Sequence, residues 1–122
     1  MLSFVLDEEK KVCKKSLLKM PLSEVINDRR RFVVLVDEKE YFEDEYFPIK
    51  EFVICSISWM IKSEKDFIYN TIDDYQNPLL AFRKLKKGWK LQSVWQKFEC
   101  EILFSFDEVF VFISNIIAQV IY

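Results

Sequence analysis

The chain has 122 residues, of which 51% are hydrophobic, and its formal net charge is −2. This length fits a single domain over residues 1–122, because a domain of this size buries roughly two-thirds of the surface of its unfolded chain. Histidine is absent and there is one glycine, which excludes Ser-His and Cys-His nucleophile pairs, most zinc or iron sites and glycine-rich phosphate loops.

The N-terminal part of the chain is expected to contain two pairs of strands. Residues 2–6 and 11–18 form the first predicted pair, and residues 31–36 and 40–43 form the second, which turns at residues 37–39. The apolar stretch at the start is only five residues long before acidic residues follow, which is shorter than the apolar region of a signal peptide. We therefore expect a cytoplasmic protein.

The second predicted hairpin carries an acidic run, residues 37–45, with six carboxylates and two aromatic side chains in nine residues. One interpretation is a solvated hairpin tip that maintains solubility and blunts an edge strand. The other is a surface for a basic partner, which the density of charge favours because the carboxylates repel one another unless a partner relieves them. The predicted partner-binding residues are Asp37, Glu38, Glu40, Tyr41, Glu43, Asp44, Glu45 and Tyr46. We expect Tyr41 and Tyr46 at the surface and the neighbouring Phe42 and Phe47 in the core.

Two helices are predicted, at about 48–62 and 106–120. The first begins with Pro48 and has apolar residues at helical spacing, although its β-branched residues leave a strand as the alternative. The second begins with Ser105 and Glu108 in the positions of a capping box, and its wide apolar face is typical of a helix that lies across a sheet. The apolar segment 109–122 is too short to span a membrane, which needs about 20 residues.

Between the two helices the apolar pattern has a period of two, which predicts strands at 67–69, 80–82, 89–95 and 98–104. Residues 86–88 contain the glycine and are expected to form a hairpin turn, and residues 73–78 a loop. The parity of the pattern changes near residues 96–97, which requires a β-bulge or a tight turn. The predicted fold class is α+β, a single antiparallel sheet of about five to seven strands packed by two helices.

Three further features bear on chemistry. The basic hairpin 83–90 has interleaved aromatic residues and predicts nucleic-acid binding as an alternative function, although a sequence pI of about 5.3 argues against it. A carboxylate enzyme is a third hypothesis. Asp73 and Asp74 are interpreted as turn residues because their loop lacks regular oxygen spacing. Cys13, Cys55 and Cys100 include no Cys-x-x-Cys pair, which indicates reduced thiols. We expect no cofactor.

A set of aromatic and polar positions between about residues 30 and 115 resembles a known group of proteins. The pattern consists of Tyr41-Phe42-x-x-Glu45-Tyr46-Phe47-Pro48-Ile49-x-Glu51-Phe52, then Trp59, Asn77-Pro78-Leu79-Leu80, Gly88-Trp89, Ser93-x-Trp95-Gln96 and a final Ser-capped helix. It is similar to small bacterial immunity proteins of polymorphic or contact-dependent toxin systems, including WapI-like proteins.

This resemblance implies a cytoplasmic inhibitor that binds the C-terminal toxin domain of a secreted effector, often a nuclease, and occludes its active site. It implies no catalytic residues. Neither the identity of the toxin nor the oligomeric state follows from it.

Overall fold

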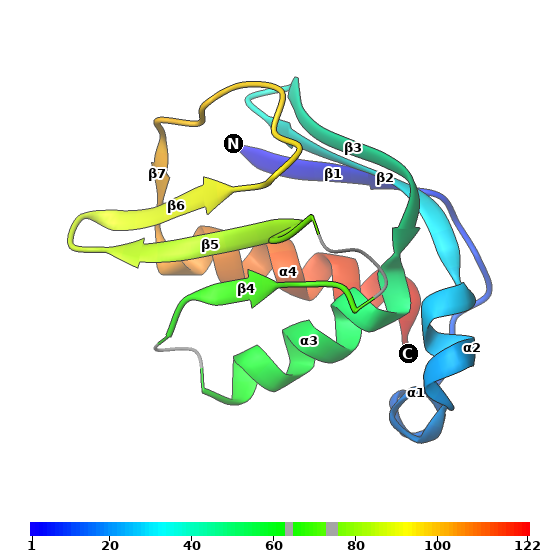
Figure 1. Cartoon of the computed structure of the whole chain (residues 1–122). Coiled ribbons are helices and arrows are strands. Elements are labelled where there is room, and N and C mark those ends of the chain that lie inside the picture. The colour runs from blue at the N-terminus through cyan, green and yellow to red at the C-terminus, as the bar shows by residue number, and fades with distance from the viewer. Residues whose placement is uncertain (63–64, 73–75) are drawn as a thin grey trace.

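The computed structural model describes residues 1–62, 65–72 and 76–122, which form seven strands and four helices (Figure 1). The strands are β1 (Leu2–Leu6), β2 (Arg29–Val36), β3 (Lys39–Pro48), β4 (Phe67–Tyr69), β5 (Leu80–Leu85), β6 (Gly88–Gln92) and β7 (Leu103–Phe104). The helices are α1 (Lys14–Lys19), α2 (Leu22–Asn27), α3 (Ile49–Ile61) and α4 (Phe106–Val120). The α+β class is confirmed, and none of these helices is long and apolar enough to cross a membrane.

The strands form two antiparallel sheets, of order β1-β2-β3 and β4-β5-β6-β7, so the prediction of a single sheet is wrong. Alternation along a strand shows that it is half-buried, but it does not show which strand lies beside it. Here β3 runs directly into α3, and this helix separates the two sheets along the chain. Both sheets still share one core, because the Phe52 ring of α3 lies 6.1 Å from Phe32 of β2 and 5.6 Å from Phe67 of β4.

The two predicted helices are confirmed as α3 and α4, and α4 begins with the capping box that the sequence indicates. Ser105 Oγ accepts from the Glu108 amide at 3.1 Å, and the Glu108 carboxylate accepts from the Ser105 amide at 3.1 Å. The strand predicted at 11–18 is wrong, because α1 occupies most of it. The Cys13 sulfur accepts from the Ser16 amide and caps this short helix.

The chain between β6 and β7 also differs from the prediction. The strand expected at 98–104 is reduced to β7, and residues 93–102 form an irregular segment, called here the edge loop. Ser93 fixes its start by donating its hydroxyl to the Leu79 carbonyl at 2.6 Å. Further along, the Lys97 amide donates to the Tyr41 carbonyl at 2.7 Å. The predicted change of parity near residues 96–97 therefore marks the place where the chain leaves the sheet. Through the bond to Tyr41, the edge loop covers part of the outer edge of β3.

Candidate partner-binding surface

The acidic run lies on the hairpin of β2 and β3, whose shape is set by one turn and two bulges. Asp37 and Glu38 form the turn with φ angles of 49° and 68°, the left-handed values that a two-residue type I′ hairpin turn requires. The pairing register shifts once at Tyr41 and again where β3 places Glu45 and Tyr46 opposite one residue of β2. Such bulges re-aim side chains relative to the sheet.

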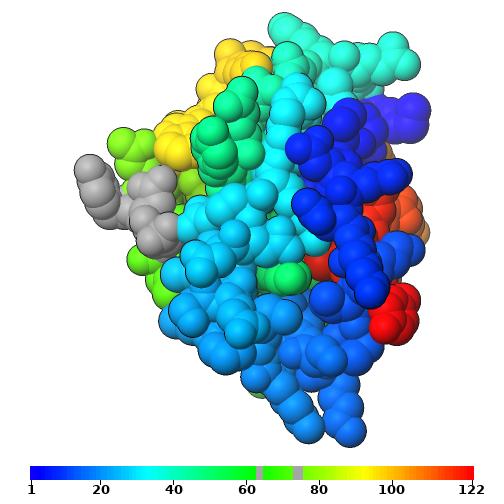
Figure 2. Space-filling model, turned by 90° about the vertical axis from the view of Figure 1, so that its right-hand side faces the viewer, coloured from blue at the N-terminus to red at the C-terminus, as the bar shows by residue number. Residues whose placement is uncertain are grey.

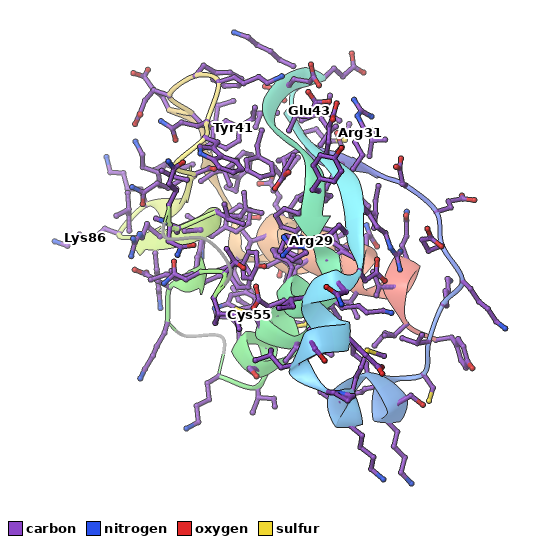
Figure 3. The ribbon with its side chains drawn as sticks, turned by 45° about the vertical axis from the view of Figure 1, so that its right-hand side comes forward. Arg29, Arg31, Tyr41, Glu43, Cys55 and Lys86 are labelled. Carbon is purple, nitrogen blue, oxygen red and sulfur yellow. The ribbon has the colours of Figure 1, made fainter. Side chains whose placement is uncertain are left out.

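Tyr41 is fully buried, so the prediction that it lies at the surface is wrong. The bulge turns its ring toward the edge loop (Figure 3), where it packs edge-to-face on Phe98 with the centroids 5.4 Å apart. Its hydroxyl donates to Gln96 Oε1 at 2.7 Å. Burial raises the pKa of Tyr41. Phe42 and Phe47 are buried as expected, whereas Tyr46, which directly follows the acidic run, is exposed.

Most of the carboxylates of the hairpin have partners inside the chain. Arg31 donates through Nε and Nη2 to one oxygen of Glu43, at 3.0 and 2.7 Å (Figure 3), and this hydrogen bonding raises the pKa of Arg31. Lys97 of the edge loop lies 3.5 Å from Glu40 and 3.7 Å from Glu43. Asp44 accepts from the Tyr46 amide at 2.9 Å, and Asp37 pairs with the amino group of Met1.

These contacts change the interpretation of the charge density. Repulsion among the six carboxylates is relieved largely by Arg31 and Lys97, so it does not by itself require a basic partner. Glu38 and Glu45 are exposed, and the side chain of neither forms a hydrogen bond or ion pair within residues 1–62, 65–72 and 76–122. Tyr46 is 70% exposed and directly follows Glu45. Figure 2 shows the hairpin tip as a projection from the top of the molecule.

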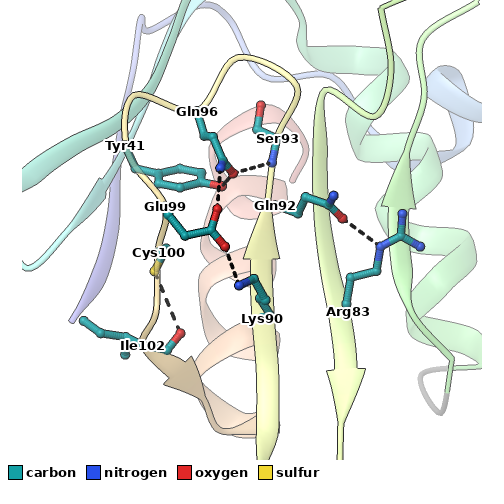
Figure 4. A network of polar contacts seen from close by, with 9 residues as sticks. All are labelled: Tyr41, Arg83, Lys90, Gln92, Ser93, Gln96, Glu99, Cys100 and Ile102. Carbon is teal, nitrogen blue, oxygen red and sulfur yellow. Dashed lines mark hydrogen bonds and ion pairs between the residues drawn. The ribbon is translucent and has the colours of Figure 1, made fainter.

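The two aromatic side chains of the basic hairpin of β5 and β6 are not available for stacking on bases. Its aromatic residues, Phe82 and Trp89, are buried and unable to stack on bases. Lys90 pairs with Glu99, which lowers the Glu99 pKa, and Arg83 Nε donates to Gln92 at 3.0 Å (Figure 4). Lys86 is exposed and points away from the body of the molecule (Figure 3).

Two hollows are lined by residues outside both hairpins. One is a groove of about 840 Å³ between β1 and the exposed face of α4, and the other is an apolar hollow of about 290 Å³ between α1, α3 and α4. The described residues contain no cluster of three or more metal-ligating side chains. Asp73 and Asp74, interpreted above as turn residues, lie outside the described residues.

The sequence predicted the acidic residues of this surface but not the side chains that contact and position them. Arg31 lies in the predicted strand and faces Glu43 across the hairpin, and opposite charge on paired strands was a usable signal for this contact. Gln96 and Lys97 are more than 50 residues from their partners, and no local pattern indicates those contacts.

Comparison with known proteins gives one match. No curated protein and no solved structure matches the chain. A family described as a domain of unknown function, DUF7878, matches residues 2–120, almost the whole length. The chain belongs to this family.

Proposed function

We propose that this protein is a cytoplasmic immunity protein, which binds the toxin domain of a polymorphic or contact-dependent toxin system and occludes its active site. The observation that carries the proposal is the exposed Tyr46 ring beside the Glu45 carboxylate, which has no polar partner among the described residues; both lie on a bulge of β3. The resemblance to WapI-like immunity proteins supports the same function. No catalytic residue is part of the mechanism.

The hairpin suits such an interface because it is held in one shape before binding. On one side β2 pairs with β3 along most of its length, and on the other the edge loop donates from Lys97 to the Tyr41 carbonyl. The buried Tyr41 anchors the edge loop through Gln96. A preorganised surface loses little conformational entropy on binding, so more of the contact energy appears as affinity.

The chemistry of the surface fits a basic cleft. Tyrosine side chains commonly contribute a large share of the energy of an interface, and Tyr46 can enter a pocket of the partner. Glu38 and Glu45 can meet lysine or arginine side chains that a nuclease uses to hold phosphates. Complementary charge also accelerates encounter. Occlusion of the cleft then blocks the substrate by steric and electrostatic means.

The test is binding to the toxin domain encoded beside the gene of this protein, measured by isothermal titration calorimetry with Y46A and with E38K/E45K. We expect each variant to weaken binding at least about 30-fold, as for a central anchor or a lost charge set. Matched controls are Y122A, whose ring is 79% exposed, and E8K/E9K, which changes two exposed acids elsewhere. Controls should bind like the wild type.

Two results would contradict the proposal in different ways. Unchanged affinity in Y46A and E38K/E45K removes this surface as the interface. Absence of binding to any neighbouring toxin domain, together with salt-sensitive RNA or DNA binding that is lost on neutralising Lys86 and Lys87, favours the nucleic-acid alternative.

A further inference from the structure

The free edge of β1 lies beside an open groove that the proposed toxin-binding surface does not use. Met1–Phe4 and Lys11 form one wall, and the exposed face of α4 forms the other, including Asp107, Val111 and Ala118. The groove has a volume of about 840 Å³. In Figure 2 the N-terminal segment runs down one side of the molecule, next to the C-terminal atoms.

The backbone of β1 presents unused hydrogen-bonding groups to this groove. The Asp37 amide donates to the Met1 carbonyl, and the Asp7 amide donates to the Arg31 carbonyl, so the odd-numbered residues of β1 face β2. In an antiparallel pair the bonding direction alternates. The amides and carbonyls of Leu2, Phe4 and Leu6 therefore point away from β2, and no described residue forms a backbone hydrogen bond with them from that side.

This edge lacks the features that protect edge strands from pairing. Natural edges carry charged residues, prolines or bulges, or are covered by another segment. The sequence of β1 is Leu-Ser-Phe-Val-Leu, without charge or proline, and its pairing with β2 has no register shift. The opposite edge of the same sheet is closed by the edge loop at Tyr41. An edge left open beside a groove points to a strand from outside the chain.

The charges at the ends of the groove indicate which strand this is. Asp107 lies in the first turn of α4 at one end. Lys11 lies at the other end, next to Val12, whose amide donates to the Val120 carbonyl near the end of α4. Both are exposed, and neither forms an ion pair within the part of the chain that the structure describes. Because β1 and α4 run in the same direction (Figure 1), a two-fold axis across the groove places Asp107 of one copy opposite Lys11 of the other.

We propose that the groove is a dimer interface, in which β1 pairs antiparallel with β1 of a second copy of this chain. Leu2, Phe4 and Leu6 of the two copies face one another, which satisfies their outward backbone groups in a continuous sheet of two three-stranded halves. The exposed faces of the two α4 helices close the groove, and two Asp107–Lys11 pairs fix the register at its ends.

Sedimentation equilibrium of the full chain tests this proposal. We expect a species of twice the 14.8 kDa of one chain at micromolar concentrations. The variant A118R places a large side chain in the groove from an exposed helical position, and it should sediment as a monomer. The charge variants K11E and D107K should each weaken dimerisation about tenfold, because each removes two pairs in a symmetric dimer. The double variant K11E/D107K reverses both charges and should recover wild-type dimerisation.

Controls of the same charge change are K15E in α1 and E24K in the first turn of α2, both exposed and outside the groove. They should dimerise like the wild type, and circular dichroism should show that every variant folds. A chain that remains monomeric up to about 1 mM overturns the proposal. So does a dimer that A118R leaves intact, or a double variant that stays as weak as its parents.

Discussion

Asp28 joins the start of β2 to the first turn of α3, and replacing it with asparagine should destabilise the fold. Its two carboxylate oxygens accept from Arg30 Nε at 3.0 Å and Nη2 at 2.9 Å, and Lys50 Nζ lies 3.1 Å away. The side chain of Arg30 is only 2% exposed, and its Nη1 has no partner among the described residues. The Asp28 carboxylate is therefore the group that neutralises a buried guanidinium.

The size of the stability loss expected for D28N follows from the burial of the Asp28–Arg30 ion pair. Removing one member of a buried ion pair typically costs about 3–5 kcal/mol, because the remaining charge is left in a poorly solvated site. Asp28 is 16% exposed and asparagine keeps one acceptor, so we expect a loss near the lower end, about 3 kcal/mol. D66N is the matched control, because Asp66 forms a more exposed pair with Arg83 at 3.5 Å. The control should lose less than about 1 kcal/mol.

The effect should also depend on pH. Burial alone raises the pKa of Asp28, but hydrogen bonds from Arg30 and Lys50 outweigh it and lower this pKa below its ordinary value. A carboxylate with a lowered pKa in the folded state contributes stability that is present above its unfolded pKa of about 4, and that is lost as the pH falls through the folded value. Urea unfolding of the wild type and D28N at pH 7 and at pH 3 measures the loss of stability and its dependence on pH. The reasoning is refuted if D28N loses less than about 1 kcal/mol of unfolding free energy at pH 7. It is also refuted if the difference in stability between the wild type and D28N does not shrink at pH 3.

Three further predictions concern the turn, a helix cap and the thiols. E38G should raise the free energy of unfolding by about 0.5–1 kcal/mol in urea titrations, because glycine adopts the φ of 68° without strain; a loss would contradict this. S105A should lower it by about 1 kcal/mol through loss of the α4 cap; no loss would show that the cap is dispensable. Cys13 should react first with iodoacetamide at pH 7.5, as read by peptide mass spectrometry, because local hydrogen bonds lower its pKa. Burial raises the pKa of Cys55 to about 11 and also raises that of Cys100, and their faster modification would contradict the assignment.

The elements with local signals were predictable from the sequence. The start of α4 follows from Ser105 and Glu108, whose cap fixes the first turn, and the hairpin turn before Gly88 follows from the glycine. α1 has no such signal, because cysteine is an uncommon capping residue and six residues are too few for a helical period. The split into two sheets depends on long-range pairing, which periodicity does not encode.

The candidate site was predictable in composition but not in geometry. The carboxylates were correctly placed on a hairpin, yet Tyr41 was expected at the surface, and at this residue a bulge shifts the register and the ring is fully buried. The edge loop also holds Tyr41 from the other half of the chain, through contacts of Gln96 and Lys97 that no local pattern indicates. Tyr46 lies at the surface because the second bulge places Glu45 and Tyr46 opposite a single residue of β2.

Tyr46 and Glu45 lie on the opposite edge of the three-stranded sheet from the dimer groove, and this makes the two proposals separable. Tyr46 and Glu45 belong to β3, the edge that the edge loop partly closes, whereas the dimer groove lies along β1. Pairing through β1 therefore leaves Tyr46 accessible in both copies. A118R should bind one toxin domain per chain with unchanged affinity, and Y46A should remain dimeric. If A118R abolished toxin binding while remaining folded, the toxin would have to contact the groove or both copies, and the assignment of separate edges would be wrong.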